Sequence, residues 1–209
     1  MKEQQKKYEL TDEFIEHWSG KKLYRIRALV TFGSVVAGQL GGFVESEKNL
    51  DQSLLGNAWL FDDAWVSGDA RVYGNAQVSG DAWVYGNAQV SGNAQVSGNA
   101  WVSGNAWVFD DAQVYGNAQV YGDASVRSYA IISDKKMIFL ASNVGSENGT
   151  LTVFNGKGGL IVTRGCFTGT VDEFLSKSAK VHDDKTRNEY KLLIEVAKSR
   201  ILGVKNERN

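Results

Sequence analysis

The feature that most constrains this fold is a six-residue repeat. An aliphatic residue stands at every sixth position from Leu54 to Ile132, and alanine at every sixth position from Ala58 to Ala130, without an insertion. An α-helix needs apolar residues at a spacing near 3.6, which a period of six does not provide. The Gly-Asn and Gly-Asp pairs in most units also oppose a helix. The repeat therefore predicts extended structure with regularly spaced turns.

Each six-residue unit is consistent with a four-residue strand followed by a two-residue corner. Strand side chains alternate between faces, so the alanine and the valine of a unit point one way and the two residues beside them point the other way. Gly and Asn at the corner tolerate the positive φ that a tight turn needs. One unit cannot bury its own apolar face, but stacked coils can, so the repeat predicts a solenoid with an Ala/Val interior.

The units resemble the hexapeptide repeat of left-handed parallel β-helices. That resemblance implies three hexapeptides per 18-residue coil and a mainly β fold. The spacing of Trp65, Trp83 and Trp101 by 18 residues agrees with it. Such coils would present three outward faces. We expect one face to carry an aromatic ladder, formed by Trp65, Trp83, Trp101, Tyr85, Gln119 and Tyr121.

Two flanks of different composition enclose the repeat at residues 54–132. Residues 1–53 are interpreted as an N-terminal cap that covers the open end of the solenoid, because a bare coil end exposes unpaired strand edges. Within this cap the sequence predicts a short helix at 11–18 with Thr11 as its N-cap, a strand at 22–32 and an irregular glycine-rich entry at 33–50.

Residues 133–209 predict a small C-terminal α/β module with three strands and two helices. The strands are expected at 136–143, 149–156 and 159–167, the last two joined as a hairpin. Thr170 and Glu173 have the spacing of a capping box, which predicts a helix at 171–182. Apolar residues near helical spacing predict a second helix at about 186–202.

Composition narrows the possible functions. Hydrophobic residues make up 43% and charged residues 22% of the chain, as in ordinary globular proteins. A net charge of −1 makes nucleic acid an unlikely partner by bulk electrostatics. The single cysteine excludes an intrachain disulfide. The sequence contains no stretch of about 18 apolar residues, so it predicts no membrane-spanning helix. We expect a cytoplasmic protein without a membrane partner.

The resemblance to known proteins extends beyond the hexapeptides. The segments 23–50 and 56–76 look like the entry of YdcK-like hexapeptide-repeat proteins of enterobacteria, phages and prophages. The segments 144–154, 162–174 and 181–190 resemble a C-terminal module of phage-encoded relatives. The resemblance implies a left-handed β-helix with end caps and a bacterial, phage or prophage setting. It supplies no established activity.

Hexapeptide acyltransferases use a histidine as general base and project a loop from their coils. The coils here contain no histidine and no insertion, and His17 and His182 lie in the flanks. Two histidines are too few for a three-histidine zinc site. The pairs at 62–63 and 110–111 could bind calcium, but they are more simply solvated corners. Cys166 precedes a predicted helix and could be an activated thiol, but a small buried side chain is the simpler interpretation. We therefore expect no catalytic residue, metal or cofactor.

The aromatic ladder is the most unusual expected surface, since exposed aromatic patches usually mark contacts. We interpret it as a protein contact, either a seam between copies of this chain, in a trimer or a dimer, or a site for another partner, and we favour the seam. A stacking platform for sugars or bases, or a surface covered by the flanks, are the alternatives.

The resulting hypothesis is a non-catalytic, oligomeric binding protein. Given the phage-like resemblance, its role would be that of an accessory protein that binds and blocks a host factor, such as a defence component, in the host cytoplasm. Two alternatives stay open. One is a hexapeptide-type acyltransferase that uses acyl-CoA, and the other is a small-molecule, nucleotide-binding sponge with pockets between subunits.

Overall fold

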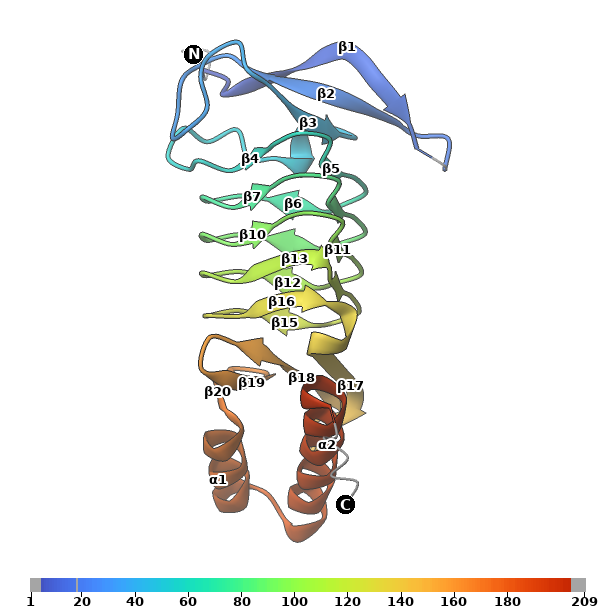
Figure 1. Cartoon of the computed structure of the whole chain (residues 1–209), viewed down its shortest axis with the longest axis vertical. Coiled ribbons are helices and arrows are strands. Elements are labelled where there is room, and N and C mark those ends of the chain that lie inside the picture. The colour runs from blue at the N-terminus through green and yellow to red at the C-terminus, as the bar shows by residue number, and fades with distance from the viewer. Residues whose placement is uncertain (1–4, 18, 204–209) are drawn as a thin grey trace, which may run out of the picture.

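The computed structural model describes residues 5–17 and 19–203, and it is an elongated parallel β-solenoid (Figure 1). Three stacks of short strands form its sides. The first sheet contains β4 (Trp59–Leu60), β7 (Gln77–Val78), β10 (Gln95–Val96), β13 (Gln113–Asn117) and β16 (Ile131–Asp134). The second contains β5 (Trp65–Val66), β8 (Trp83–Val84), β11 (Trp101–Val102) and β14 (Gln119–Val120). The third contains β6 (Arg71–Val72), β9 (Gln89–Val90), β12 (Trp107–Val108) and β15 (Ser125–Val126).

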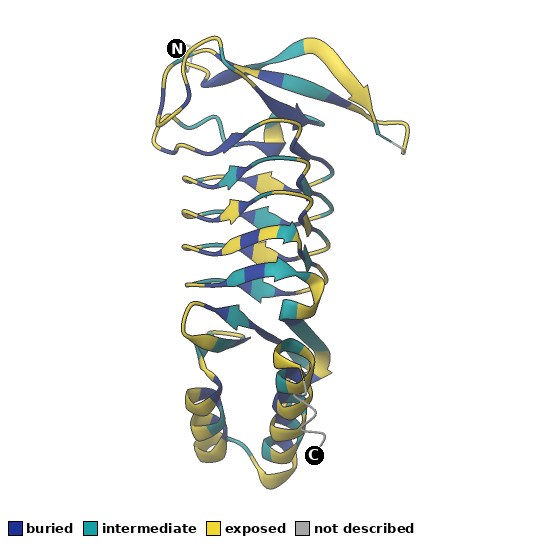
Figure 2. Cartoon of the chain, viewed as in Figure 1, coloured by how far each residue is buried: buried dark blue, intermediate teal, exposed yellow. Residues whose placement is uncertain are grey.

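The register of these strands confirms the 18-residue coil. Trp65 pairs with Trp83, and Trp83 pairs with Trp101, always in parallel. Backbone hydrogen bonds join successive coils, for example from Trp83 N to Ala100 O at 2.9 Å. The repeated alanines and the valines from Val66 to Val126 are at most 1% exposed and fill the interior as predicted. Figure 2 shows this buried band running through the stack.

The corners follow the predicted turn chemistry. Gly68, like the glycines at this position from Gly74 to Gly122, has a positive φ, here 67°. Asp62 and Asp110 stand at the same corner position with φ of 54° and 56°. Side chains at the next corner position form a column of hydrogen bonds between coils. Asn75 Nδ2 donates to Asn93 Oδ1 at 3.2 Å, and Asn93 Nδ2 donates to Asp111 Oδ1 at 3.0 Å. The Asn and Asp residues therefore also link one coil to the next.

The N-terminal segment does not contain the helix expected at 11–18. Residues Tyr8–Glu16 instead form strand β1, and Trp18 lies outside the described residues. β1 pairs antiparallel with β2 (Lys22–Ala28), which pairs antiparallel with β3 (Leu40–Val44). Thr11 is no helix cap, because its Oγ1 donates to the backbone oxygen of Arg25 at 3.0 Å. Pairing with β2 outweighs the helical tendency of this acidic segment.

Solenoid stacking begins before residue 54. β3 lies parallel to β5, with Phe43 beside Trp65 and Val44 beside Val66. The 3₁₀ helix η1 (Glu47–Asn49) follows β3 and leads to Leu50, which forms a parallel bridge with Val72. Leu54, expected at the first inward position, is 47% exposed. Val44 and Leu50 are buried and already fill the interior positions of the first coil.

The C-terminal module has four strands rather than three. They are β17 (Ile138–Val144), β18 (Gly149–Gly156), β19 (Gly159–Arg164) and β20 (Phe167–Thr170), preceded by the 3₁₀ helix η2 (Lys135–Met137). The strand expected at 159–167 splits at a tight turn where Gly165 has a φ of 54°. The expected β18–β19 hairpin is present.

Two helices complete this module, α1 (Val171–Val181) and α2 (Asp184–Leu202). The predicted capping box is confirmed, since Glu173 N donates to Thr170 Oγ1 at 3.2 Å and Thr170 N donates to Glu173 Oε2 at 2.7 Å. The helices pack on the four-stranded sheet around a second core that includes Leu151, Phe174 and Tyr190. Within the described residues, neither helix is long and apolar enough to cross a membrane.

Candidate functional site

The expected aromatic ladder is present on the sheet formed by β5, β8, β11 and β14. The rings of Trp83 and Trp101 stack with centroids 5.0 Å apart and an interplanar angle of 2°. Trp65 and Trp83 are 4.2 Å apart and tilted by 51°. Parallel pairing at identical coil positions brings these rings together, because side chains on successive coils of one sheet face project in the same direction.

The N-terminal cap covers the first ring of this ladder. Trp65 is only 8% exposed and forms a small cluster with Leu23 and Phe43. The His17 ring lies edge-on to it with centroids 4.9 Å apart. Trp65, predicted as a contact residue, is therefore already buried within its own chain. The alternative of a surface covered by the flanks applies to this ring.

The remainder of the ladder is more open than Trp65. Trp83 and Tyr85 are half-buried, Trp101 is 37% exposed, Gln119 is half-buried and Tyr121 is 55% exposed. We call these five residues the aromatic face. The structure places the six predicted residues on one side of the solenoid, but only these five lie on its accessible part.

The other outward tryptophans have different surroundings. Trp59 is fully buried beneath the N-terminal segment, edge-on to Tyr8 at 6.2 Å and to Phe32 at 5.4 Å between ring centroids. Trp107, on the third sheet, is 50% exposed and lies edge-on to Phe109. Near the cap, an outward position in the repeat therefore does not mean that the side chain is exposed.

The two candidate histidines lie at opposite ends of the molecule, whereas Cys166 and His182 both line a pocket of the C-terminal module. His17 follows β1 at one end of the molecule, and its Nδ1 lies 2.6 Å from Ser19 Oγ. His182 follows α1 at the other end (Figure 1). Cys166 is exposed in the β19–β20 turn rather than buried as the simpler interpretation had it, which corrects that expectation.

The acidic corners are engaged in the structure of the coils. Asp62 Oδ2 accepts a hydrogen bond from Gly80 N at 3.1 Å, and Asp63 forms an ion pair with Arg25 at 3.2 Å. Asp111 accepts from the asparagine of the coil before it. Across residues 5–17 and 19–203, no group of three or more His, Cys, Asp or Glu side chains is arranged to hold a metal ion.

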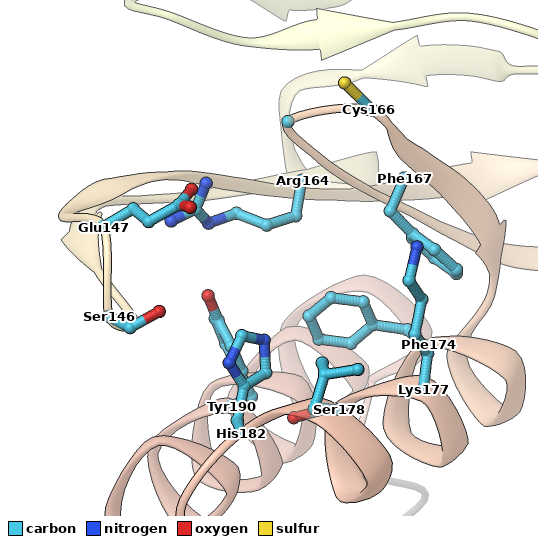
Figure 3. A pocket seen from close by; sticks show the side chains of 12 residues that line it. Ser146, Glu147, Arg164, Cys166, Phe167, Phe174, Lys177, Ser178, His182 and Tyr190 are labelled. Atoms are coloured by element: carbon cyan, nitrogen blue, oxygen red, sulfur yellow. The ribbon is translucent and has the colours of Figure 1, made fainter.

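The C-terminal module contains a pocket that the sequence did not reveal (Figure 3). It has a volume of about 230 Å³ and lies between the β17–β18 turn, the β19–β20 turn and the two helices. Its lining includes Glu147, Arg164, Phe167, Phe174, Lys177 and Ser178, with Cys166, His182 and Tyr190. One part of the pocket could have been expected from the sequence, because helical spacing places four of its lining residues on one face of α1: Phe174, Lys177, Ser178 and Val181. The turns that complete the pocket have no recognisable sequence pattern.

Coils of this geometry define a parallel β-solenoid protein. Within the coils, the family model of the YdcK beta solenoid repeat matches residues 64–80, 76–92, 88–104, 94–110 and 112–128. The segment 64–128 therefore carries this repeat, which confirms the resemblance for the coils. A search of curated proteins found no match to the chain.

Proposed function

We propose that this chain is a non-catalytic binding protein that associates with copies of itself through the aromatic face. The main support for the proposal is that the N-terminal cap covers only one end of the aromatic ladder. The cap buries Trp65, whereas Trp101 and Tyr121 on the same sheet are 37% and 55% exposed. A second copy would bury the open part as the cap buries the first ring.

The shape of this surface supports a protein partner. Coplanar indoles on a flat sheet offer a rigid apolar area, and aromatic residues are enriched in the buried centres of interfaces. A contact between copies also covers the same patch on every subunit when the assembly closes. The positions of His17 and His182 at opposite ends favour binding over acyl transfer within one chain.

The test is sedimentation velocity of the wild type and of a Trp83→Gln/Trp101→Gln variant. Glutamine is chosen because Gln119 occupies the equivalent position on the next coil. We expect the wild type to sediment as an oligomer and the variant as a smaller particle with an unchanged β-type circular dichroism spectrum. The outward side chains contribute little to the Ala/Val interior, so the fold should persist.

Trp107→Gln is the matched control, because Trp107 is 50% exposed on a different sheet. It should keep the wild-type mass. A double variant with the wild-type mass, or a wild type that is monomeric at tens of micromolar, would contradict the proposal.

We further propose that the assembled protein binds and blocks a host factor, such as a defence component. This part rests on the resemblance of the entry and tail segments to phage-encoded proteins. Expression of the wild type in a bacterium with an active defence system should raise the plating efficiency of a sensitive phage. The Trp83→Gln/Trp101→Gln variant should raise it less, and equal plating with and without the wild type across a panel of defence systems would refute this part.

A further inference from the structure

The pocket of the C-terminal module has an aromatic floor. The Phe167 and Phe174 rings lie 5.3 Å apart, and the Phe174 and Tyr190 rings lie 5.0 Å apart, between centroids. His182 adds a ring 5.5 Å from that of Tyr190. Figure 3 shows these rings lining one side of the pocket. Such a floor favours a compact apolar group, because it buries apolar surface and offers tilted ring contacts.

Two polar groups beside this floor lack hydrogen-bond partners. Ser178 is 3% exposed and lines the pocket, and its Oγ has no partner among the residues that the structure describes. Arg164 uses Nη2 to donate to Val144 O at 3.2 Å, but its buried Nε has no partner within the same part of the chain. Buried polar groups are normally paired, so these two atoms make the wall of the pocket unusually polar, although protein atoms cover both of them.

The charges around the pocket favour an anion. Arg164 and Lys177 are cationic, and among the described residues that line the pocket Glu147 is the one carboxylate. Lys177 extends over the Phe167 ring, with Nζ 5.3 Å from the centroid, which places its charge beside the aromatic floor.

The size of the pocket limits the ligand. The pocket has a volume of about 230 Å³. This is below the range of about 300–1,000 Å³ that is typical of sites for drug-sized ligands. The space therefore suits a single ring or a short branched chain with one charged group.

We propose that this pocket binds a small carboxylate with a compact apolar body. The carboxylate lies toward Lys177, the apolar body packs on Phe167 and Phe174, and Arg164 adds positive charge from the opposite side of the pocket (Figure 3). This site is separate from the aromatic face, and the proposal does not depend on self-association.

Cys166 provides a readout at the rim, because it is the chain's single cysteine and is exposed among the residues that line the pocket, with its sulfur directed away from the aromatic floor (Figure 3). The probe is benzoate, titrated into the millimolar range because so small a ligand binds weakly. The rate of Cys166 alkylation by iodoacetamide is followed by intact mass. We expect benzoate to slow alkylation at least threefold with a saturable dependence, while benzamide and sodium chloride at equal ionic strength have no such effect.

Two variants locate the charge recognition. Lys177→Gln should weaken the protection by benzoate about tenfold, the change expected for loss of one charge-assisted contact of about 1.4 kcal/mol. Lys180→Gln is the matched control, since Lys180 is exposed on the same helix and is not among the lining residues. Both lysines are on the surface, so the fold should be retained, and the melting temperature verifies this.

The proposal fails if benzoate gives no saturable protection, or if benzamide protects equally well. It also fails if Lys177→Gln and Lys180→Gln behave alike. A nuclear magnetic resonance titration provides a second measurement, in which amide shifts caused by benzoate should concentrate in the β17–β18 and β19–β20 turns and along α1. Shifts confined to the solenoid would contradict the assignment.

Discussion

Lys7 is a charge held inside the N-terminal cap. Its side chain is 0% exposed, and Nζ donates to Ala58 O at 3.2 Å and lies 5.0 Å from the Phe32 ring centroid. Burial lowers the pKa of Lys7 from 10.5 to about 8, against the smaller raising effect of Asp51. The folded protein therefore loses this proton at a lower pH than the unfolded chain does.

This difference predicts an unusual pH dependence of stability. Between the folded pKa of about 8 and the unfolded value of 10.5, the unfolded chain binds more protons, so the free energy of unfolding rises with pH. We expect a rise of about 1.5 kcal/mol from pH 8 to pH 9.5, within the limit of about 1.36 kcal/mol per pH unit. Urea unfolding at several pH values measures it.

The control is Lys7→Met, which should flatten this rise. The pH range must end below 10, because burial and the charges of Glu47 and Asp51 raise the pKa of Tyr8 above its usual value of 10.0. A tyrosine that ionises only when unfolded lowers stability at higher pH. A wild type whose stability is flat or falling between pH 8 and 9.5 would contradict the assignment to Lys7.

The inward valines should be intolerant of charge. Val96 is 0% exposed and pairs with Val78 and Val114 on neighbouring coils. Val96→Asp would remove roughly 1.5–3 kcal/mol of burial and add an unpaired buried carboxylate, so we expect no folded protein. Gln95→Asp changes the exposed outward neighbour and should retain the wild-type spectrum and nearly its melting temperature. Circular dichroism distinguishes the two outcomes.

At the level of single residues, the repeat predicted whether a side chain points into or out of the solenoid, but not whether an outward side chain is exposed. Alternation is local, so the inward positions of Ala and Val followed from the sequence alone. Whether an outward tryptophan is covered depends on a distant segment. Trp65 is buried by Leu23 and Phe43, whereas Trp101 is 37% exposed. No local pattern distinguishes these two positions.

The corners are the element that repeats most strictly. Gly92 has a φ of 67°, and a Cβ added there would lie 2.8 Å from Asp110 N on the next coil. Gly92→Ala therefore combines left-handed strain of about 1–2 kcal/mol with a clash against backbone. We expect the free energy of unfolding to fall by at least about 1 kcal/mol, measured by urea unfolding.

Gly158→Ala is the matched control for this change. Gly158 lies in the β18–β19 turn, has no positive φ and has no atom within 4 Å of an added Cβ. Its effect should stay within about 0.5 kcal/mol, as is usual for surface changes. Equal losses in the two variants would show that the corner geometry does not limit stability.

Elements outside the repeat were harder to predict. Residues 11–18 contain acidic and apolar residues that favour a helix as readily as a strand. Their partner decides the outcome, since β1 lies beside the basic strand β2 and ion pairs join Glu9 to Arg27 and Glu13 to Arg25. The helix at 171–182 was predictable because its capping box is local. The pocket was not, because it combines two turns and two helices.

At the scale of the whole molecule, two hydrophobic cores meet at one strand. The solenoid core includes Phe154 of β18, whereas Leu151 and Val153 of the same strand belong to the core of the C-terminal module. Hydrogen bonds reinforce this junction, since Thr163 Oγ1 donates to Ser125 O at 2.7 Å and Arg127 Nη2 donates to Phe167 O at 3.0 Å. The module therefore closes the open end of the last coil and should unfold together with it.

Phe154→Ala should uncouple the two parts. Phe154 is 0% exposed, and loss of a buried phenylalanine costs about 3–5 kcal/mol. The six tryptophans all lie within the first 107 residues, so their fluorescence reports the cap and coils. Helical circular dichroism at 222 nm reports α1 and α2. In the wild type the two urea transitions should coincide, as a cooperative unit requires. In Phe154→Ala the helical signal should be lost first, because coils far from the junction contact only their neighbours.

Leu192→Ala is the control, because Leu192 is 58% exposed on α2 and is not among the described residues of either hydrophobic core. Its two transitions should remain coincident. Separate transitions already in the wild type would mean that the module folds independently of the coils. Coincident transitions in Phe154→Ala would contradict the prediction. They would mean that the hydrogen bonds of Thr163 and Arg127 are enough to couple the coils to the C-terminal module.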